Sequence, residues 1–313
     1  MVVEVPTPRR GPGQVLIKLT AAGMNPMDRT LASGDWRPMR ATFPMVLGAD
    51  GAGVIDTVGD GTARFSAGDH VFGQLLIAPL GSAGTYAEYV AVTEDAPLAW
   101  VPDGLGLVVA AALPTAGMTG LYLVEHVLGP LTGRILLIVG AGGGIGSFAT
   151  QLAVNAGAHV IANVLESAAD RMREYGVAET VDHTLTPVAD AVRKADPDGI
   201  DVLLDLASDR DAFAKLAALV RPGGKAVTTK FVADTGALKP AGVTGVNFAL
   251  HDFERSGGGL SLASSELLDR VAQAVLTGRI MAPPITRISL EDAPAVLSAA
   301  DREGTEGKTV ITL

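Results

Sequence analysis

The first hundred residues carry short segments of alternating apolar and polar positions, separated by glycine and proline. Gln14–Thr20 (QVLIKLT) shows the two-residue period of a half-buried strand. We expect further short strands at Val54–Val58, Gly68–Gly73 and Thr85–Val92. Short strands at such close intervals predict a small β-barrel or sandwich.

Beyond Pro102, continuous apolar runs alternate with segments of helical spacing, and Leu107–Val127 is helical with a break at Pro114. Runs of this kind are typical of strands buried on both faces of a parallel sheet. They are Arg134–Val139, His159–Val164, Asp201–Leu206 and Lys225–Thr229, and the helical segments between them are Ser147–Asn155, Ala168–Tyr175 and Arg210–Val220. The alternation predicts a doubly wound α/β unit.

The last fifty residues predict a helix over Glu266–Leu276, a second helix over Leu290–Ala300 and a closing strand over Lys308–Leu313. A single strand at the end of a chain needs a sheet with which to pair. We expect it to return to the β-rich first part, which makes that domain discontinuous in sequence.

Composition narrows the possible functions. The chain has 313 residues, 48% of them hydrophobic, which is enough for a sizeable core. Its net charge of −10, without a cluster of lysines and arginines, argues against nucleic-acid binding. It has no cysteine, which excludes disulfides, thiolate catalysis and cysteine-bound zinc, and this fits a cytoplasmic protein. Neither a signal peptide nor a membrane-spanning stretch is expected.

A glycine-rich turn follows the apolar run Ile135–Val139 and precedes a helical segment. Glycine permits a tight turn, lets the backbone approach a pyrophosphate and lets the helix pack closely on the strand, while the helix N-terminus attracts the anion. The turn therefore predicts a dinucleotide site, although a plain strand–helix loop is the alternative. Its residues are Gly140, Ala141, Gly142, Gly143, Gly144, Ile145 and Gly146.

The end of the next strand indicates which dinucleotide is bound. NAD sites usually place an acidic residue there, about 20 residues beyond the turn, whereas this strand ends in Ala162-Asn163-Val164-Leu165, without an acid. Asn163 can bond a ribose hydroxyl, and Ser167 and Arg171 are candidates to contact a 2′-phosphate. NADPH is therefore favoured over NADH. Glu166 is the counter-argument, because its carboxylate suits NAD, and Arg171 can instead be an ordinary solvated charge.

Several segments, taken in order along nearly the whole chain, resemble the medium-chain dehydrogenase/reductase superfamily and its zinc-independent quinone oxidoreductase branch. The matching stretches are Ala21–Asp28, Phe43–Gly53, Gly68–Gly73, Gly84–Val90, Gly140–Gly146, Arg221–Lys225 and Gly307–Val310.

The resemblance implies an α/β fold, with a Rossmann doubly wound parallel sheet and a discontinuous β-rich GroES-like domain. The implied domains are a GroES-like substrate domain over 1–106, a Rossmann domain over 107–252 and a return to the first domain over 253–313, with the cofactor in the cleft between them. Relatives are often homodimers through edge pairing of their Rossmann sheets, here near Val243–Leu250. They also usually begin with a further hairpin, whose absence leaves open a truncated N-terminus.

The zinc enzymes of the superfamily place a cysteine and a histidine where this sequence has Asn25 and Ala49. Neither asparagine nor alanine is a plausible zinc ligand. The five histidines are scattered without ligand spacing. We therefore expect no metal in the site.

Without a metal, the chemistry best suited to the chain is direct hydride delivery to a small acceptor that is already electrophilic, such as a quinone or conjugated carbonyl. By resemblance, Asn25 and Thr119 are the catalytic candidates, although Thr119 can equally be a helix cap. Asp28 and Tyr86 are weak candidates for a proton donor. The candidate pocket residues are Trp36, Phe43, Phe248 and Phe253, and Ala207 is added to the cofactor contacts.

Three other functions remain open at this point. The chain can be a 2-enoyl reductase acting on an enone or enoyl thioester. It can be a non-catalytic NADPH-binding redox sensor. A zinc alcohol dehydrogenase with relocated ligands is the third alternative.

Overall fold

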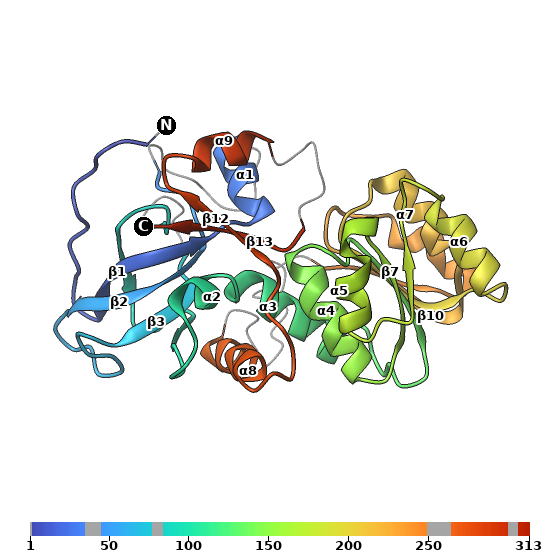
Figure 1. Ribbon diagram of the computed structural model, residues 1–313, viewed down its shortest axis with the longest axis horizontal. Helices are drawn as coiled ribbons and strands as arrows, with labels where there is room; N and C mark the ends of the chain where they lie inside the picture. Colours follow the sequence, from blue (N-terminus) through green and yellow to red (C-terminus); the bar gives the residue numbers. More distant parts are fainter. Residues whose placement is uncertain (1, 35–44, 77–83, 249–263, 300–305) are drawn as a thin grey trace. The chain divides into compact units, whose positions relative to one another are not determined.

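The computed structural model describes residues 2–34, 45–76, 84–248, 264–299 and 306–313. The chain forms two compact units (Figure 1). The first unit comprises Met1–Met118 and Leu260–Leu313, and the second comprises Thr119–Gly259. The division after Met118, rather than after 106, reflects the helix that begins at Leu107, which packs on the strands of the first unit. The domain limits 1–106, 107–252 and 253–313 stay predictions.

The first unit is built on a β-sheet whose strands come from both ends of the chain. These strands are β1 (Gln14–Gly23), β2 (Asp50–Val58), β3 (His70–Gln74), β4 (Tyr89–Thr93), β5 (Leu98–Trp100), β12 (Ile285–Ser289) and β13 (Lys308–Thr312). The order is β12-β13-β1-β2-β3-β5, with β4 also on β1. All pairs are antiparallel except β12 with β13. Because β13 pairs with β1, the β-rich domain is discontinuous, as predicted.

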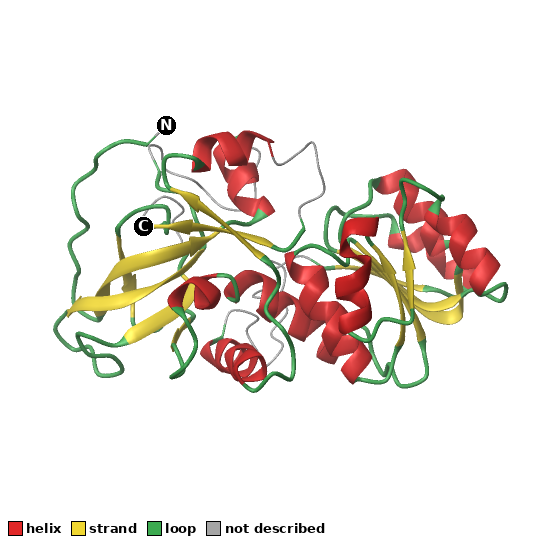
Figure 2. Ribbon diagram, viewed as in Figure 1, coloured by secondary structure: helices red, strands yellow, loops and turns green. Residues whose placement is uncertain are grey.

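The alternation in the sequence explains how this sheet forms. Val15, Ile17 and Leu19 of β1 are buried in one apolar cluster, together with side chains of β2 to β5. The helices of the unit are α1 (Pro26–Ala32), α2 (Leu107–Ala111), α8 (Ser265–Leu276) and α9 (Ala293–Ala299), and α3 (Pro114–Tyr122) begins in it. They cover the ends and faces of the sheet (Figure 2).

One predicted strand of this unit begins later than expected. Thr85 and Tyr86 lie before β4, which starts at Tyr89. Their backbone N–H groups donate to the carbonyls of Gly48 and Leu47 instead. This turn packs the Tyr86 ring against Gly48, where an added Cβ would lie 2.4 Å from the ring. The strand prediction over Thr85–Val92 was therefore wrong in its first half.

The second unit is a parallel sheet with helices on both faces (Figures 1 and 2). Its strands are β6 (Ile135–Val139), β7 (His159–Asn163), β8 (Glu179–Val181), β9 (Ile200–Asp205), β10 (Val220–Thr228) and β11 (Thr244–Asn247), in the order β11-β10-β9-β6-β7-β8. Its helices are α4 (Gly144–Asn155), α5 (Ala169–Glu174), α6 (Val188–Ala195) and α7 (Arg210–Ala217), with a π-helical turn at Leu123–Val127 and 3₁₀ turns at Glu166–Ala168 and Thr235–Ala241. This is the predicted doubly wound arrangement.

The apolar runs of the second unit fill its core. Leu137, Ile161 and Leu203, from three neighbouring strands, are fully buried. Within the described residues, every helix falls short of the length and hydropathy that a membrane-spanning helix requires.

Candidate functional site

The glycine-rich turn joins β6 to α4. Gly140 has φ +78°, a left-handed conformation that favours glycine. A Cβ on Gly146 would lie 2.2 Å from the carbonyl oxygen of Gly140, so α4 can start this close to the strand only with glycine there. Helix α4 begins at Gly144, three residues earlier than predicted, with Gly143 in an extended conformation before it. The turn therefore has the close backbone packing that the sequence predicts.

This turn suits the pyrophosphate of a dinucleotide. Helix α4 is twelve residues long, and its first turn carries no acidic side chain. Its N-terminal N–H groups and its dipole favour an anion. A pyrophosphate site requires close approach of the backbone and a positive potential. The chain's own residues supply both.

The guanidinium of Arg171 lies at the turn itself. Its Nη2 donates to the carbonyl oxygen of Gly142 at 3.2 Å, and the side chain is partly buried. This placement differs from that of a fully solvated helix charge. Ser167 lies nearby in sequence, in the 3₁₀ turn Glu166–Ala168 that precedes α5. Contact of either residue with a 2′-phosphate stays a prediction.

Asn163 is the last residue of β7, one residue before the predicted end of this strand, and its side chain is buried. Its Nδ2 donates to the carbonyl of Val181 at 3.0 Å and lies 3.3 Å from Nδ1 of His183. The carboxamide therefore links the ends of β7 and β8. Sequence reasoning did not single out His183 as its neighbour, because the two residues are 20 positions apart. The ribose contact of Asn163 stays a prediction.

Ala207 lies beside the turn, just past the end of β9. A Cβ on Gly140 would be 3.0 Å from the Cβ of Ala207. The loop is shaped by Asp205, whose Oδ1 accepts the backbone N–H groups of Ala207 and Ser208 at 3.0 and 2.8 Å. The structure thus brings Ala207 to the glycine-rich turn, although Asp205 was not identified from the sequence.

Thr119 and Phe248 also belong to the second unit. Thr119 is 1% exposed, and its hydroxyl has no hydrogen-bond partner among the described residues. Such a hydroxyl is available to a ligand, but it does not single Thr119 out, because the hydroxyls of Thr85 and Thr150 are buried and unpartnered as well. The Phe248 ring is buried 6.0 Å from the ring of Tyr122. The other pocket candidates, Trp36, Phe43 and Phe253, lie outside the described residues.

Asn25, in the first unit, is the residue before α1. Pro26 occupies the first helical position, and the Asp28 carboxylate accepts the Asn25 backbone N–H at 2.7 Å. These are the signals of a helix N-terminus. They fix the backbone of Asn25 at the end of β1, which brings its side chain to the strand ends β2 and β13.

A buried polar network surrounds Asn25. Its Nδ2 donates to Asp50 at 2.9 Å, and its Oδ1 accepts from Lys308 Nζ at 2.7 Å. The Lys308 ammonium is 3.6 Å from the Asp50 carboxylate, which also accepts from the Thr115 hydroxyl at 2.6 Å. Gln74 Nε2 donates to the same hydroxyl at 3.1 Å. We call Asn25, Asp50, Gln74, Thr115 and Lys308 the Asn25 network.

Asp28 and Tyr86 adjoin this network. The Tyr86 hydroxyl donates to Asp28 Oδ2 at 2.6 Å. Burial raises the pKa of Asp28 to about 6, although the hydrogen bonds from Tyr86 and Asn25 act in the opposite direction. Burial, together with the Asp28 charge, raises the pKa of Tyr86. A Tyr86 hydroxyl that already donates to Asp28 is a poor proton donor to a substrate. The geometry therefore does not strengthen the case for either residue as the proton donor.

The Asn25 network does not fit a zinc ion. Zinc binds cysteine, histidine and carboxylate side chains, whereas the network offers two carboxamides, one hydroxyl and one carboxylate. The Lys308 ammonium already lies against the Asp50 carboxylate and the Asn25 oxygen. Within the described ranges, no group of three or more His, Asp or Glu side chains is placed to hold a metal.

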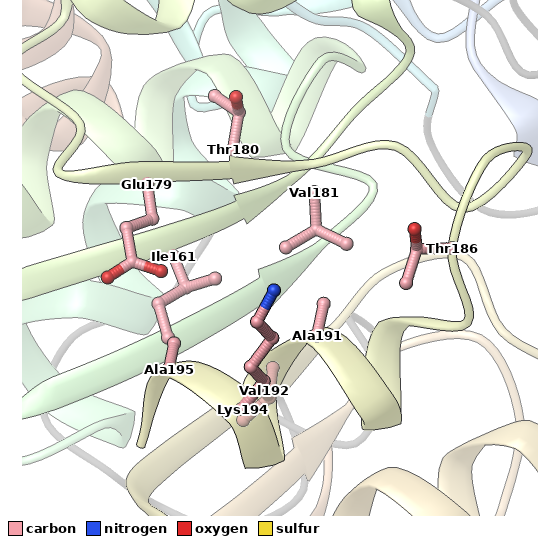
Figure 3. Close-up of a pocket in the computed structure, with 9 residues that line it drawn as sticks. All are labelled: Ile161, Glu179, Thr180, Val181, Thr186, Ala191, Val192, Lys194 and Ala195. Atoms are coloured by element: carbon pink, nitrogen blue, oxygen red, sulfur yellow. The ribbon is translucent and has the colours of Figure 1, made fainter.

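A hollow lies elsewhere in the second unit (Figure 3). It has a volume of about 370 Å³ and opens between α6 and the sheet edge, with Glu179 and Lys194 at its border. None of its lining residues belongs to the glycine-rich turn. It was not predicted, and it is not part of the cofactor site described above.

Two family models match the chain. The alcohol dehydrogenase GroES-like domain matches residues 11–103, and a family described as zinc-binding dehydrogenase matches residues 144–253. The first match lies in the first unit and the second match in the second unit. They agree with the β-rich and Rossmann architectures seen in the structure.

Individual relatives carry related names. The spectinabilin polyketide synthase system protein NorB of Streptomyces orinoci is 31% identical over 96% of the chain, but the chain spans only 13% of its length. A chloroplastic NADPH-dependent alkenal/one oxidoreductase of Arabidopsis thaliana is 32% identical over 73% of the chain and 57% of its own length. The chain thus spans less than two thirds of both relatives.

A solved quinone oxidoreductase of Pseudomonas syringae pv. Tomato superposes with a TM-score of 0.86 and 28% identity, covering 99% of the chain and 94% of that protein. It agrees with the two family matches, which cover residues 11–103 and 144–253. The chain therefore belongs to the quinone oxidoreductase branch of the medium-chain dehydrogenase/reductase superfamily.

Proposed function

We propose that the chain is an NADPH-dependent reductase that delivers hydride to a quinone or a similar conjugated carbonyl without a metal ion. The observation that carries the proposal is the glycine-rich turn, with Arg171 held against Gly142 and no acidic residue at the end of β7. When bound there, the dinucleotide would supply hydride from C4 of its nicotinamide.

The choice of NADPH rests on charge. A 2′-phosphate carries negative charge that an acidic residue at the end of β7 would repel, whereas Asn163 is neutral and Arg171 is cationic. The similarity to an NADPH-dependent relative supports the same choice. We expect NADH to bind more weakly because it leaves the Arg171 charge without that phosphate.

The residues of the chain supply binding and orientation. The turn amides would hold the pyrophosphate, and the Thr119 hydroxyl offers a hydrogen bond that no described protein group takes. Asn25 offers a carboxamide from a rigid, buried setting. With asparagine and alanine at the positions of the zinc ligands, the chain has little means to activate an unconjugated ketone. An acceptor that is already electrophilic is therefore expected.

The similarity to a polyketide synthase protein favours a second candidate, a reductase of enoyl thioesters. Purified protein mixed with NADPH and, separately, with benzoquinones, enones and enoyl thioesters distinguishes the two. The proposal predicts the highest kcat/KM with a quinone or enone. A preference for thioesters supports the second candidate, and tight NADPH binding without turnover of any acceptor indicates a redox sensor and refutes both.

We also propose a homodimer in the cytoplasm. Strand β11 stands at one end of the described sheet order of the second unit, with one paired side. Such an edge can pair with a second copy. Light scattering during size-exclusion chromatography measures the mass directly, and a monomer contradicts this part of the proposal.

A further inference from the structure

The carbonyl of Gly142, in the glycine-rich turn, is held by side chains of the two helices that flank it. Nη2 of Arg171, in α5, donates to this carbonyl at 3.2 Å, and the hydroxyl of Ser147, in α4, donates to it at 3.4 Å. The N–H of the same peptide belongs to Gly143 and donates to the Gly140 carbonyl at 3.2 Å. The peptide between Gly142 and Gly143 is therefore fixed at both of its polar groups.

Tyr175 completes this arrangement from the end of α5. Its hydroxyl forms a hydrogen bond with Ser147, and the residue is 6% exposed. Burial raises the pKa of Tyr175, although the Arg171 charge and the bond with Ser147 act in the opposite direction, so the phenol keeps its proton. A serine hydroxyl has a single hydrogen, which Ser147 directs to Gly142, so Ser147 accepts from Tyr175. We call the Tyr175 hydroxyl, the Ser147 hydroxyl and the Gly142 carbonyl the Tyr175 relay.

A turn made of glycines is a flexible support for a ligand. Glycine loses more conformational freedom on ordering than any other residue, and five of the seven residues over Gly140–Gly146 are glycine. A ligand that has to order such a turn loses affinity, whereas a turn that is already ordered avoids that loss. The fixed peptide comes directly before Gly144, the first residue of α4. It therefore sets the direction of the N–H groups at this helix N-terminus.

The relay differs from Arg171 in what it can do. Arg171 is also the candidate contact for a 2′-phosphate, and a guanidinium that turns toward this phosphate gives up its bond to Gly142. Ser147 is fully buried and Tyr175 nearly so, which keeps both hydroxyls away from a phosphate. The relay therefore holds the Gly142 carbonyl whether or not the cofactor carries a 2′-phosphate.

We propose that Tyr175 is a positioning residue for the dinucleotide: through Ser147 it fixes the Gly142 carbonyl, so that the amides at the start of α4 stay directed toward the pyrophosphate. The inference rests on the proposed function, because it takes this turn as the dinucleotide site. NADPH and NADH carry the same pyrophosphate. The relay therefore raises the affinity for both by the same factor and does not choose between them.

The test measures dissociation constants for NADPH and NADH by titration calorimetry. Tyr175→Phe and Ser147→Ala each remove one hydroxyl of the relay. We expect each change to weaken the binding of both cofactors about fivefold, which corresponds to one neutral hydrogen bond, with kcat at saturating NADPH unchanged. Unchanged dissociation constants in both variants would overturn the proposal. A loss confined to NADPH would overturn it as well, since that is the pattern of a 2′-phosphate contact.

The double variant shows whether the two hydroxyls act as one unit. S147A/Y175F should bind both cofactors no more weakly than S147A does, because the relay is already broken in S147A. A loss of about 25-fold, the product of two independent effects, would contradict the relay.

Two control variants separate the relay from a general effect on the fold. Thr150→Val is the match for Ser147→Ala, because it removes another buried hydroxyl three residues further along α4. Tyr89→Phe, in β4 of the first unit, is the match for Tyr175→Phe. Both controls should keep the wild-type dissociation constants. A fivefold loss in Thr150→Val would show that any buried hydroxyl of α4 has this effect, and the proposal would fail.

Amide hydrogen exchange tests the relay without a cofactor. The N–H groups of Gly143 and Ser147 are bonded to the carbonyls of Gly140 and Gly143. In Y175F both amides should exchange about fivefold faster than in the wild type, while the amides of β9 keep their rates. Equal rates at the turn overturn the proposal. A wild-type protein that binds NADPH but reduces no acceptor refutes the proposed reductase alone, and one that binds neither cofactor refutes both.

Discussion

Gly146→Ala tests whether α4 must pack against the glycine-rich turn as closely as the structure shows. The added Cβ would lie 2.2 Å from the Gly140 carbonyl oxygen and 2.7 Å from the Ala141 Cα. Both are backbone atoms, so the start of the helix must move by about 1 Å, at a cost of about 3 kcal/mol for overpacking. The better helix propensity of alanine returns about 1 kcal/mol. The free energy of unfolding should therefore fall by about 2 kcal/mol.

The same movement draws the N–H groups of α4 away from a bound pyrophosphate. Loss of a helix-terminus interaction of up to ~2 kcal/mol weakens NADPH binding about 30-fold. Urea denaturation measures the stability, and quenching of tryptophan fluorescence or calorimetry measures the affinity. Gly142→Ala is the matched control for stability, because its Cβ would meet Arg171 and Val164 at 3.4 and 3.5 Å, which are ordinary contacts. Wild-type stability and affinity in the Gly146→Ala protein would refute this account of the turn.

Three further predictions concern buried or charged groups. Thr119→Val should raise stability by about 1 kcal/mol, because it removes a buried unpartnered hydroxyl, yet it should lower kcat/KM. Thr150→Val removes another such hydroxyl, in α4, and should stabilise the protein without changing its turnover. The pKa of Asp28 is about 6 in the folded protein, against 3.8 for the free side chain, so the native state holds this proton more tightly than the unfolded state does. The free energy of unfolding should therefore fall by up to about 3 kcal/mol as the pH rises from 4 to 6, and then level off. Asp28→Asn should flatten that interval in urea melts, and a wild-type profile that rises there would contradict the assignment. Arg171→Ala should raise KM for NADPH about 10-fold and leave KM for NADH nearly unchanged, for a loss of about 1.4 kcal/mol; equal effects on both cofactors would exclude a 2′-phosphate contact.

The sequence predicts the glycine-rich turn well because every requirement of that turn is local. The strand, the glycines and the helix occupy adjacent positions, and Gly140 and Gly146 show their packing role in the structure. The pairing of the closing strand with β1 could also be predicted, since a strand without a partner sheet is unstable. Short elements were missed: β8 has three residues, and β12, Ile285–Ser289, lacks clean alternation.

The Asn25 network could not be predicted, because its members lie far apart in the sequence. Lys308 reaches Asn25 across 283 positions, and Asp50 reaches Thr115 across 65. A single lysine at the start of a terminal strand is ordinarily a solvated charge, and nothing local indicates that it is buried. The role of Asp205 could not be predicted either, since an acidic residue at a strand end can have many roles.

The central claim is that this chain reduces an electrophilic carbonyl with NADPH and needs no metal to do so. The most direct measurement is the initial rate of NADPH oxidation with a benzoquinone or an enone, using protein treated with a strong chelator. The account predicts turnover that persists after this treatment, gains nothing from added zinc and has a higher kcat/KM with NADPH than with NADH. Turnover that appears only when zinc is restored, or no oxidation with any acceptor, would contradict it.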